Sequence, residues 1–597
     1  MYIREIKKKN KGFEKEFIYH RLVHSYRTKE GPRQKTILNM GKLDIPRKQW
    51  KILANRIEMI LKGQQILFPA PDKIWALAHH YANIIKRNTL SACIKESKEE
   101  KLQQIDINNI TTHDAKTIGA EYVGLTAYKA LELNKLLKSL GFSDKQSHIA
   151  CLLIVSKLIH PGSERQIRHF ITEESGITEL LGIDLKISNN ALYRISDLLI
   201  EHKEQIENHI RQKLKDLFSL KETIIFYDLT NTYFEGSGSN AKRGRSKDKR
   251  NDRPLITLGL VLDEDGFVKG SRVFPGNISE PKTLLEAIKI ITKRGKYAPL
   301  PFLRPTIVLD AGIATKDNLE ALKRQGLYYI VISRQGPDEK VLKEENIEIK
   351  EGITANLYQQ DNEYFILCKS KAKLQKEQAI ISKARKAMEK ELEKIKAGLS
   401  KKGGIKNYQR IAERIGRLRE RYKRVSSGYR IEIKKQEAKA VDIVWEFDES
   451  NLGKPYDGSY YLRTNRVDLS AERIWSIYVM LTRVEDAFRS LKSELGFRPV
   501  HHSKKERIEG HLFVSVLSYH LLSYIQYLLK RSGINHRWGT ILSYLRTHQV
   551  VTTTLPKKDG CLLIRGCTVP TLKQREIYRA LGLSDSPLKQ RIAEVSL

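Results

Sequence analysis

Three acidic residues of this sequence stand in positions from which they could share a metal ion. Asp228 follows the apolar run 223–227 and Asp310 follows the run 306–309, so we expect both where a strand ends. In α/β sheets ligands bind outside the carboxyl ends of the strands, and the two carboxylates converge there if their strands are neighbours. Glu485, on a later helix, would complete the set. Because a single Asp at a strand end is more often a cap or a turn residue, the hypothesis depends on all three.

Carboxylates are hard oxygen ligands, and Mg²⁺ or Mn²⁺ binds through a few of them together with substrate phosphate. Two such ions, about 3.5–4 Å apart, would activate water or a 3′ hydroxyl and stabilise the leaving oxygen in an in-line displacement at phosphorus. That reaction needs no Cys or His triad, and the sequence shows none. The three carboxylates therefore predict metal-dependent phosphoryl transfer.

Glu485 lies within residues 473–492, which we expect to form one helix. At about 100° of rotation per residue, Tyr478, Glu485 and Lys492 fall on a single narrow face together with apolar residues such as Leu481. Such a face is expected to pack inward. A carboxylate there must be paired, hydrogen-bonded or bound to metal, because an isolated charge is costly to desolvate.

The net charge of +37 over 597 residues is extreme for a chain with 40% hydrophobic residues. The simplest partner for such a surface is a polyanion, because Lys and Arg displace counterions from phosphate backbones. Ribosomal or membrane-surface binding would satisfy the same charge. The charge indicates the class of partner and leaves the chemistry open.

The cysteines indicate a reducing compartment, because the five of them form no CxxC pair and no zinc ribbon is expected. The N-terminus has no apolar signal segment. Residues 511–529 resemble a membrane span in length, but His520 and Gln526 interrupt the apolar run, so we expect a buried helix. A cytoplasmic protein without a membrane segment is the expectation.

The N-terminal third is expected to hold two regions. Strands around the turn at residues 29–32 and a helix ending at Gly63 form a small unit, which either contacts DNA or packs on its neighbour. The following region is helical, with Ser163 and Ser188 as N-caps. The helix after Ser188 resembles the second helix of a helix-turn-helix, although ordinary helical packing is the favoured alternative.

Residues 221–335 change to short β-branched and aromatic runs. Three strands joined by short links come first, followed by a helix, a strand, a second helix and a strand. This order predicts an α/β fold, a ribonuclease-H-like mixed sheet, within a chain that is multidomain α+β overall. Asp263 to Gly266 are expected to form the turn between the second and third strands.

Residues 371–424 carry 19 Lys and Arg but only six Glu. Apolar residues recur at helical spacing on both sides of Gly403 and Gly404, which predicts a basic helical hairpin followed by a short β segment. A solvated hairpin without a ligand is the alternative to a nucleic-acid contact. We expect this segment to be inserted into the α/β fold.

The segments expected along the chain are therefore six. They are residues 1–70, a small basic β+α unit; 71–220, a helical region expected to bind DNA; 221–335, the first part of the core; 336–467, the inserted basic hairpin and β segment; 468–530, the remainder of the core with the Glu485 helix; and 531–597, a C-terminal α+β region.

Five motifs resemble those of one protein family. They are FYDLTNTYFEG, FPGNISEPKTLL, TIVLDAGIAT, DGSYYLRTN and RVEDAFRSLKSELGFRPVHHSKKERIEGH, and they span residues 226–511. The chain resembles a bacterial insertion-sequence transposase of the DDE class, in the branch with a Tyr-Arg-Glu-Lys signature. The resemblance implies that Asp228, Asp310 and Glu485 are the catalytic metal ligands. In the signature, Tyr478, Glu485 and Lys492 fit, whereas Leu481 occupies the Arg position.

Arg483 lies near Leu481 on another helical face and is a candidate substitute for the signature Arg. The residues expected to contact DNA come from the signature helix and from the basic loop 236–253 beside Asp228. They are Tyr478, Arg483, Lys492, Lys242, Arg243, Arg245, Lys247 and Arg489. The histidines of HHSKKERIEGH, His501, His502 and His511, are expected to contact phosphate or to support the metal ligands rather than to bind zinc.

The resemblance implies a transposase that binds the terminal inverted repeats of its own element, cleaves DNA with Mg²⁺, or Mn²⁺, and joins the 3′ ends to target DNA. Its partners would be double-stranded DNA and, on paired ends, a second copy of the chain. Its location would be the bacterial cytoplasm, with the nucleoid. The alternatives are a stand-alone metal-dependent nuclease and a DNA-binding protein with an inactive transposase core.

Overall fold

The computed structural model describes most of the chain. The described residues are 1–9, 16–28, 31–62, 71–92, 104–220, 223–235, 242–248, 250, 252–292, 304–339, 341–452, 456–558 and 560–596. They belong to two compact units, of which the first comprises Met1–Leu217, Glu235–Ser239 and Arg489–Leu597, and the second comprises Phe218–Phe234 and Asn240–Phe488. The six-segment division stays a prediction.

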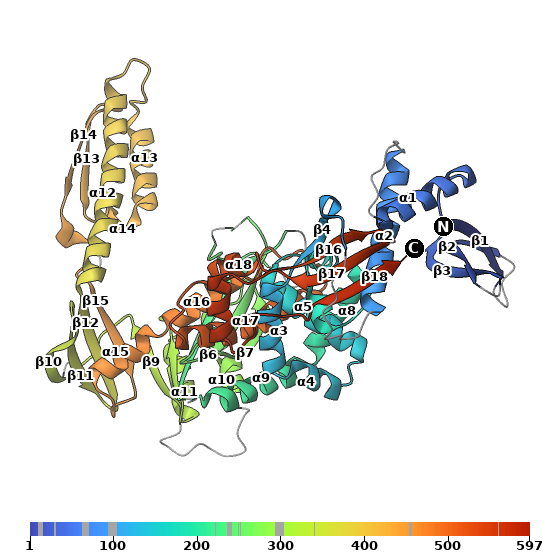
Figure 1. Cartoon of the computed structure of the whole chain (residues 1–597). Helices are drawn as coiled ribbons and strands as arrows, with labels where there is room; N and C mark the ends of the chain where they lie inside the picture. Colours follow the sequence, from blue (N-terminus) through green and yellow to red (C-terminus); the bar gives the residue numbers. More distant parts are fainter. Residues whose placement is uncertain are drawn as a thin grey trace. The chain divides into compact units, whose positions relative to one another are not determined.

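A nine-stranded mixed sheet forms the centre of the second unit (Figure 1). Its strands, in spatial order, are β10 (Val341–Lys350), β11 (Ile353–Gln360), β12 (Glu363–Ser370), β15 (Ser459–Thr464), β9 (Tyr328–Ser333), β8 (Thr306–Leu309), β5 (Ile224–Tyr233), β6 (Leu255–Asp263) and β7 (Val268–Pro275). The strands β5, β6 and β7 are antiparallel, whereas β5, β8 and β9 are parallel. This arrangement confirms the predicted ribonuclease-H-like mixed sheet.

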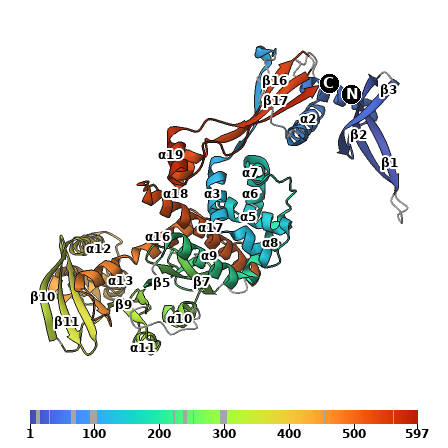
Figure 2. The ribbon, with the colours of Figure 1, turned by 60° about the horizontal axis from the view of Figure 1, so that its bottom comes forward.

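Helices α10 (Leu284–Thr292) and α11 (Lys316–Arg324) cover one face of this sheet (Figure 2). Alternate strand residues such as Tyr227 and Leu309 form one buried apolar cluster with the helices. The turn predicted between β6 and β7 is present, since Asp263 accepts hydrogen bonds from the N–H groups of Asp265 and Phe267. Gly266 in this turn has φ of +87°, which glycine adopts without strain.

The expectation that residues 336–467 leave the sheet is wrong for four strands. β12 pairs with β15, and β15 pairs with β9, so β10, β11, β12 and β15 extend the core sheet. Sequence periodicity shows that these segments are strands but does not show their partners, because pairing joins β12 to a strand that follows it by about ninety residues along the chain.

Only the part between β12 and β15 forms a separate arm, the predicted basic hairpin (Figure 1). It consists of α12 (Lys371–Ser400), α13 (Tyr408–Arg421), α14 (Lys423–Ser426), β13 (Tyr429–Gln436) and β14 (Lys439–Phe447). The apolar residues expected to face one another share one buried core, in which Met388 and Leu392 are fully buried. The arm therefore carries its own hydrophobic core.

The helix expected over residues 473–492 is in fact two helices, α15 (Ala471–Val479) and α16 (Thr482–Ser493). Met480 and Leu481 form a tight turn between them, in which the Leu481 N–H donates to the Tyr478 carbonyl. Val484 and Ala487 are buried in α16, whereas Glu485 is exposed. The expectation of one continuous inward face is therefore wrong, because the turn interrupts the helix between Tyr478 and Glu485.

The first unit contains two small sheets and a set of helices. The sheets are β1 (Tyr2–Lys9), β2 (Glu16–Thr28) and β3 (Gly31–Gly41), and β4 (Thr111–Thr117) with β16 (Gln549–Lys557), β17 (Gly560–Cys567) and β18 (Arg591–Ser596). The helices are α1 (Trp50–Lys62), α2 (Asp72–Ala92), α3 (Gly119–Ala130), α4 (Leu133–Ser139), α5 (Asp144–Ile159), α6 (Glu164–His169), α7 (Ile177–Leu181), α8 (Asn189–Glu201), α9 (Lys203–Phe218), α17 (Lys505–Arg531), α18 (Trp538–Leu545) and α19 (Leu572–Ala580).

Several local predictions for this unit are confirmed, while its predicted DNA contacts stay a prediction. Ser163 and Ser188 are N-caps whose side chains accept N–H hydrogen bonds. Helix α17 is long and apolar enough to cross a membrane by composition, but 72% of its most apolar window is buried inside the protein, as expected for a core helix. Helix α8 packs against α5 and α17, in agreement with ordinary helical packing. β4 was not expected, because its partner β16 follows it by more than 400 residues.

Replacement of Leu392 tests whether the arm is held by its own core. Leu392 on α12 is fully buried in the core that α12 shares with the later elements of the arm. Leu392→Ala is therefore expected to lower the local free energy of unfolding by about 2–5 kcal/mol. Hydrogen exchange should show faster exchange of arm amides while the nine-stranded sheet keeps its protection. Val441→Ala is the matched control, because Val441 on β14 is 48% exposed. Equal protection in the two variants would contradict the assignment.

Candidate active site

Asp228 and Asp310 lie side by side at one end of the parallel strands. β5 and β8 pair in parallel up to Tyr227 opposite Leu309, and the next residue on each strand is the aspartate. One detail of the prediction is wrong: β5 does not end at Asp228 but continues to Tyr233 alongside β6. Asp228 therefore lies where the parallel pairing ends rather than where its strand ends.

The Asp228 carboxylate is mostly buried, with 18% of its side chain exposed, and it accepts a hydrogen bond from the Leu229 N–H. Burial is the main cause that raises the pKa of Asp228 to about 6, and the charges of Asp310 and Glu280 raise it further. Lys247 opposes this shift, with its Nζ 3.8 Å from Asp228 Oδ1. Asp310 is exposed and accepts from the Ala311 N–H at 2.7 Å.

Glu280 is a fourth carboxylate in the same neighbourhood, and it was not named from the sequence. Its Oε1 lies 3.4 Å from Lys247 Nζ, so one ammonium faces both Asp228 and Glu280. Its Oε2 lies so close to Gly312 that a side chain at Gly312 would collide with it. The motif FPGNISEPKTLL contains Glu280, but nothing in the local pattern separates this acid from any other at a helix start.

The position of Glu280 follows from a buried amide. Asn318 on α11 donates to the carbonyls of Pro281 and Ile313, at 2.9 and 2.7 Å. These two bonds tie the segment that begins with Glu280 to the turn after Asp310. Thr315 caps α11 by accepting from the Asn318 N–H, so the same asparagine also begins the helix.

The described part of the basic loop is attached to β5 by Asn231. Its side-chain amide donates to the Arg245 carbonyl at 2.9 Å and accepts from the Lys247 N–H at 3.0 Å. Lys247 Nζ donates to the Leu229 carbonyl at 2.6 Å. These bonds place Lys247 beside Asp228, while Lys242, Arg243 and Arg245 are exposed to solvent. Positions 236–241, 249 and 251 lie outside the described residues.

Tyr478 on α15 connects the third carboxylate to the first two. Burial raises the pKa of the Tyr478 hydroxyl well above its usual range, and the negative charges of Asp310, Glu485 and Asp228 add to the shift. All three carboxylates therefore act on one half-buried hydroxyl. The carboxylate oxygens of these three acids do not all lie within 4.8 Å of one another. Among the described residues, only the group of Glu164, His502 and His511 meets that criterion. Ligands divided between two ions do not require such closeness.

The remaining signature residues are placed as follows. Leu481 lies in the turn between α15 and α16, and Arg483 lies in the first turn of α16, half-buried. Arg489 and Lys492 lie in the later turns of α16, within the part of the helix that belongs to the first unit. The turn at Leu481 removes the premise of one helical face. Whether Arg483 replaces the signature Arg stays a prediction.

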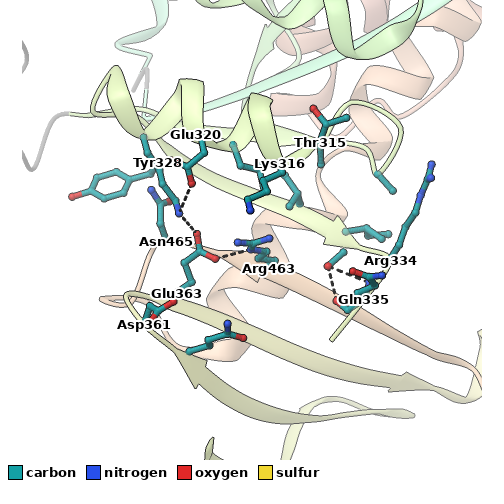
Figure 3. A pocket seen from close by; sticks show the side chains of 18 of the residues that line it. Thr315, Lys316, Glu320, Tyr328, Arg334, Gln335, Asp361, Glu363, Arg463 and Asn465 are labelled. Carbon is teal, nitrogen blue, oxygen red and sulfur yellow. Dashed lines mark hydrogen bonds and ion pairs between the residues drawn. The ribbon is translucent and has the colours of Figure 1, made fainter. Parts of the chain in front are cut away.

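A polar cavity of about 1220 Å³ extends from the turn after Asp310, between α11 and the added strands (Figure 3). At its floor the Glu363 carboxylate meets Lys323 at 2.7 Å and Arg463 at 2.6 Å. Lys316 and Arg334 also line the cavity and are exposed. The added strands therefore place charged side chains next to the carboxyl end of β8.

Comparison with known proteins agrees with this geometry. Residues 219–521, just over half of the chain, match the transposase DDE domain, and residues 3–70 match the N-terminal domain of IS1634 family transposases. The chain belongs to the DDE transposase family. The resemblance to an insertion-sequence transposase is thus confirmed, and with it a DNA-cleaving transposase. The Tyr-Arg-Glu-Lys signature stays a prediction.

No curated protein matches this transposase in sequence. A solved structure similar to it is the piggyBac transposase synaptic complex with hairpin DNA, at 8% identity and a TM-score of 0.32, covering 68% of this chain and 70% of that chain. A similarity of this degree carries no argument about the site.

DDE transposases use divalent metals, and the carboxylates of this transposase suit one. The donors are all oxygen, which Mg²⁺ and Mn²⁺ prefer. Burial is the main cause that raises the pKa of Asp228, the repulsion from Asp310 and Glu280 adds to it, and only Lys247 faces Asp228 with a positive charge among the interactions that shift it. A cation bound between the carboxylates would relieve this repulsion.

Replacement of Asn231 tests how the basic loop is held. Asn231→Ala removes two hydrogen bonds to the loop, each worth about 0.5–1.5 kcal/mol, and should raise the open population of the segment roughly 5- to 150-fold. Limited proteolysis with trypsin should cleave after Arg245 and Lys247 correspondingly faster. Asn362→Ala, at an exposed turn of the same unit, is the control. Unchanged cleavage in Asn231→Ala would show that other contacts hold the loop.

Proposed function

We propose that this transposase cleaves DNA at the ends of its own element with Mg²⁺, or Mn²⁺, held by Asp228, Asp310 and Glu485, and then joins the 3′ ends to target DNA. The observation that supports this most directly is the parallel pairing of β5 with β8, which sets Asp228 beside Asp310 within a chain of net charge +37. All three carboxylates raise the pKa of Tyr478, which supports Glu485 as the third metal ligand.

The metal ions would supply a water or 3′ hydroxyl activated for attack and charge stabilisation of the leaving oxygen. Asp228 and Asp310 would hold the ions at the end of the parallel strands, and the ions would bind the oxygens of the DNA phosphate. Tyr478 is uncharged at neutral pH, as tyrosines normally are, and burial raises its pKa further, so its hydroxyl can donate a hydrogen bond to a phosphate oxygen. Lys247 would exchange its contacts with Asp228 and Glu280 for a phosphate once the carboxylates are neutralised.

The DNA would follow the basic surfaces around the site. The exposed Lys242, Arg243 and Arg245 would contact the backbone near Asp228, and Arg483, Arg489 and Lys492 would contact it along α16. Because two element ends must be joined in one event, the active species is proposed to be a homodimer on paired terminal inverted repeats. The proposed location is the bacterial cytoplasm, on the nucleoid.

Replacement of Glu485 tests the metal site. Glu485→Gln keeps the size of the side chain and removes its charge, so Mg²⁺- or Mn²⁺-dependent nicking of element-end DNA should be abolished while DNA binding without metal is retained. Gel assays of cleavage and of binding measure the two properties separately. Glu472→Gln, an exposed acid on the preceding helix α15, should cleave normally. Undiminished cleavage by Glu485→Gln would refute the assignment.

Glu280 offers a second test of the same site. If its charge helps the carboxylates to attract a cation, Glu280→Gln should weaken Mn²⁺ binding, and an effect of about 10–100-fold is typical of residues that support metal ligands. Isothermal titration of Mn²⁺ measures this directly, with Glu472→Gln again as the control. Unaltered Mn²⁺ affinity would show that Glu280 does not help to attract the cation and only contacts Lys247.

Two alternatives are separated by simple assays. A stand-alone nuclease on the same fold would cleave but would not join precut 3′ ends to a second DNA, so a strand-transfer assay with precut ends decides between them. A DNA-binding protein with an inactive core would bind no Mg²⁺ or Mn²⁺ in the titration.

A further inference from the structure

Two of the histidines in HHSKKERIEGH meet a carboxylate from a distant part of the chain. His502 Nε2 lies 3.1 Å from Glu164 Oε1, and His511 Nδ1 lies 3.5 Å from the same oxygen. Glu164 is the first residue of α6, His502 lies in the segment before α17, and His511 lies on α17. Glu164 and His511 are buried, with 5% and 7% of each residue exposed. All three belong to the first unit.

The spacing of these three residues suits a tetrahedral metal ion. Each offers one ligand atom, and the three atoms lie within 4.8 Å of one another. Nitrogen and oxygen ligands about 2.0–2.1 Å from Zn²⁺ at tetrahedral angles are separated by about 3.3–3.4 Å. The contacts of Glu164 with His502 and His511 bracket this separation.

The hydrogen bonding of His511 is incomplete without a further ligand. Its Nδ1 contact to Glu164 is at the limit of a hydrogen bond, and its Nε2 has no partner among the described residues. An ion between Glu164 and His502 would give Nδ1 a stronger partner than this 3.5 Å contact, whereas Nε2 lies on the other side of the ring and is not explained by an ion there. Lys157 does not provide the missing contact, since its ammonium donates to the carbonyls of Gly162 and Gly496.

The surrounding contacts hold the three ligands in place. Lys157 joins the turn before Glu164, at Gly162, to the segment that leads to His502, at Gly496. A side chain at Gly510 would collide with the Ser196 carbonyl, so glycine lets α17 approach α8 directly beside His511.

The ring of Tyr193 on α8 meets the ring of His502 edge-on at 5.7 Å. Arg507 lies over the Tyr193 ring and pairs with Asp197 at 2.9 Å. These outer contacts orient the His502 ring, as residues behind metal-ligating histidines commonly do.

We propose that Glu164, His502 and His511 bind one transition-metal ion of the Zn²⁺ class, at a site separate from the carboxylates proposed for DNA cleavage. Imidazole and carboxylate ligands favour Zn²⁺ over Mg²⁺, which prefers oxygen donors alone. The ion would join α6, the segment before α17 and α17. The basic, helical setting of HHSKKERIEGH disfavours zinc in the sequence, and the third ligand, Glu164, lies 338 residues before His502, outside any local pattern.

Cobalt substitution of the full-length chain tests this proposal. After removal of metal with EDTA, one equivalent of Co²⁺ should give the intense visible bands of a tetrahedral site, and Zn²⁺ should displace them and raise the melting temperature. His502→Ala should lose the bands. His501→Ala, an exposed neighbour in the same segment, should keep them, as should Asp228→Asn in the separate carboxylate site.

His502→Cys guards against a trivial loss through misfolding, because a thiolate ligand should restore binding and add a sulfur-to-cobalt charge-transfer band in the near ultraviolet. The proposal is overturned if the folded wild-type chain retains no Zn²⁺ and gives no tetrahedral Co²⁺ bands. It is also overturned if the bands persist in His502→Ala or disappear in Asp228→Asn. In these cases the three residues form a hydrogen-bonded cluster only.

Discussion

The parallel pairing of β5 with β8 places two negative charges on adjacent strands, and much of the second unit compensates for that placement. Asp228 is largely buried, so its charge is disfavoured both by loss of water and by the neighbouring Asp310. Such a carboxylate must be hydrogen-bonded, protonated or faced by a cation. In the described structure Lys247 takes that role, and a divalent metal would take it more effectively.

Several local features follow from this constraint. The basic loop must reach back to β5, and Asn231 secures it with two hydrogen bonds. The segment carrying Glu280 must approach the turn after Asp310, and Asn318 fixes it there while Gly312 leaves room. Two buried amides and one glycine thus determine the charge balance around the carboxylates.

The edge of the parallel sheet also determines where the added strands and the basic arm are attached. β9 is the last strand of the parallel part of the sheet. β15 pairs with its outer edge, β12 pairs with β15, and the basic arm lies between β12 and β15 in the chain. An edge strand exposes unpaired N–H and C=O groups, and added strands satisfy them. The arm has a separate core, so its charge can vary without altering the sheet.

The sequence by itself determined what depends on local pattern. The strand-like runs before Asp228 and Asp310, the helical spacing of Met388 and Leu392, and the N-caps at Ser163 and Ser188 each depend on neighbours along the chain. The structure has these features, although β5 continues past Asp228.

Tertiary structure alone decided the rest. The place of Glu280 near Asp228, the meeting of Glu164 with His502 and His511, and the pairing of β12 with β15 join residues far apart in the chain. The turn at Leu481 is also not evident in the helical pattern, because a local change to hydrogen bonds three residues apart leaves the apolar spacing on each side intact. Periodicity records which way a side chain faces within its own element, whereas pairing register and packing decide which other residue it meets.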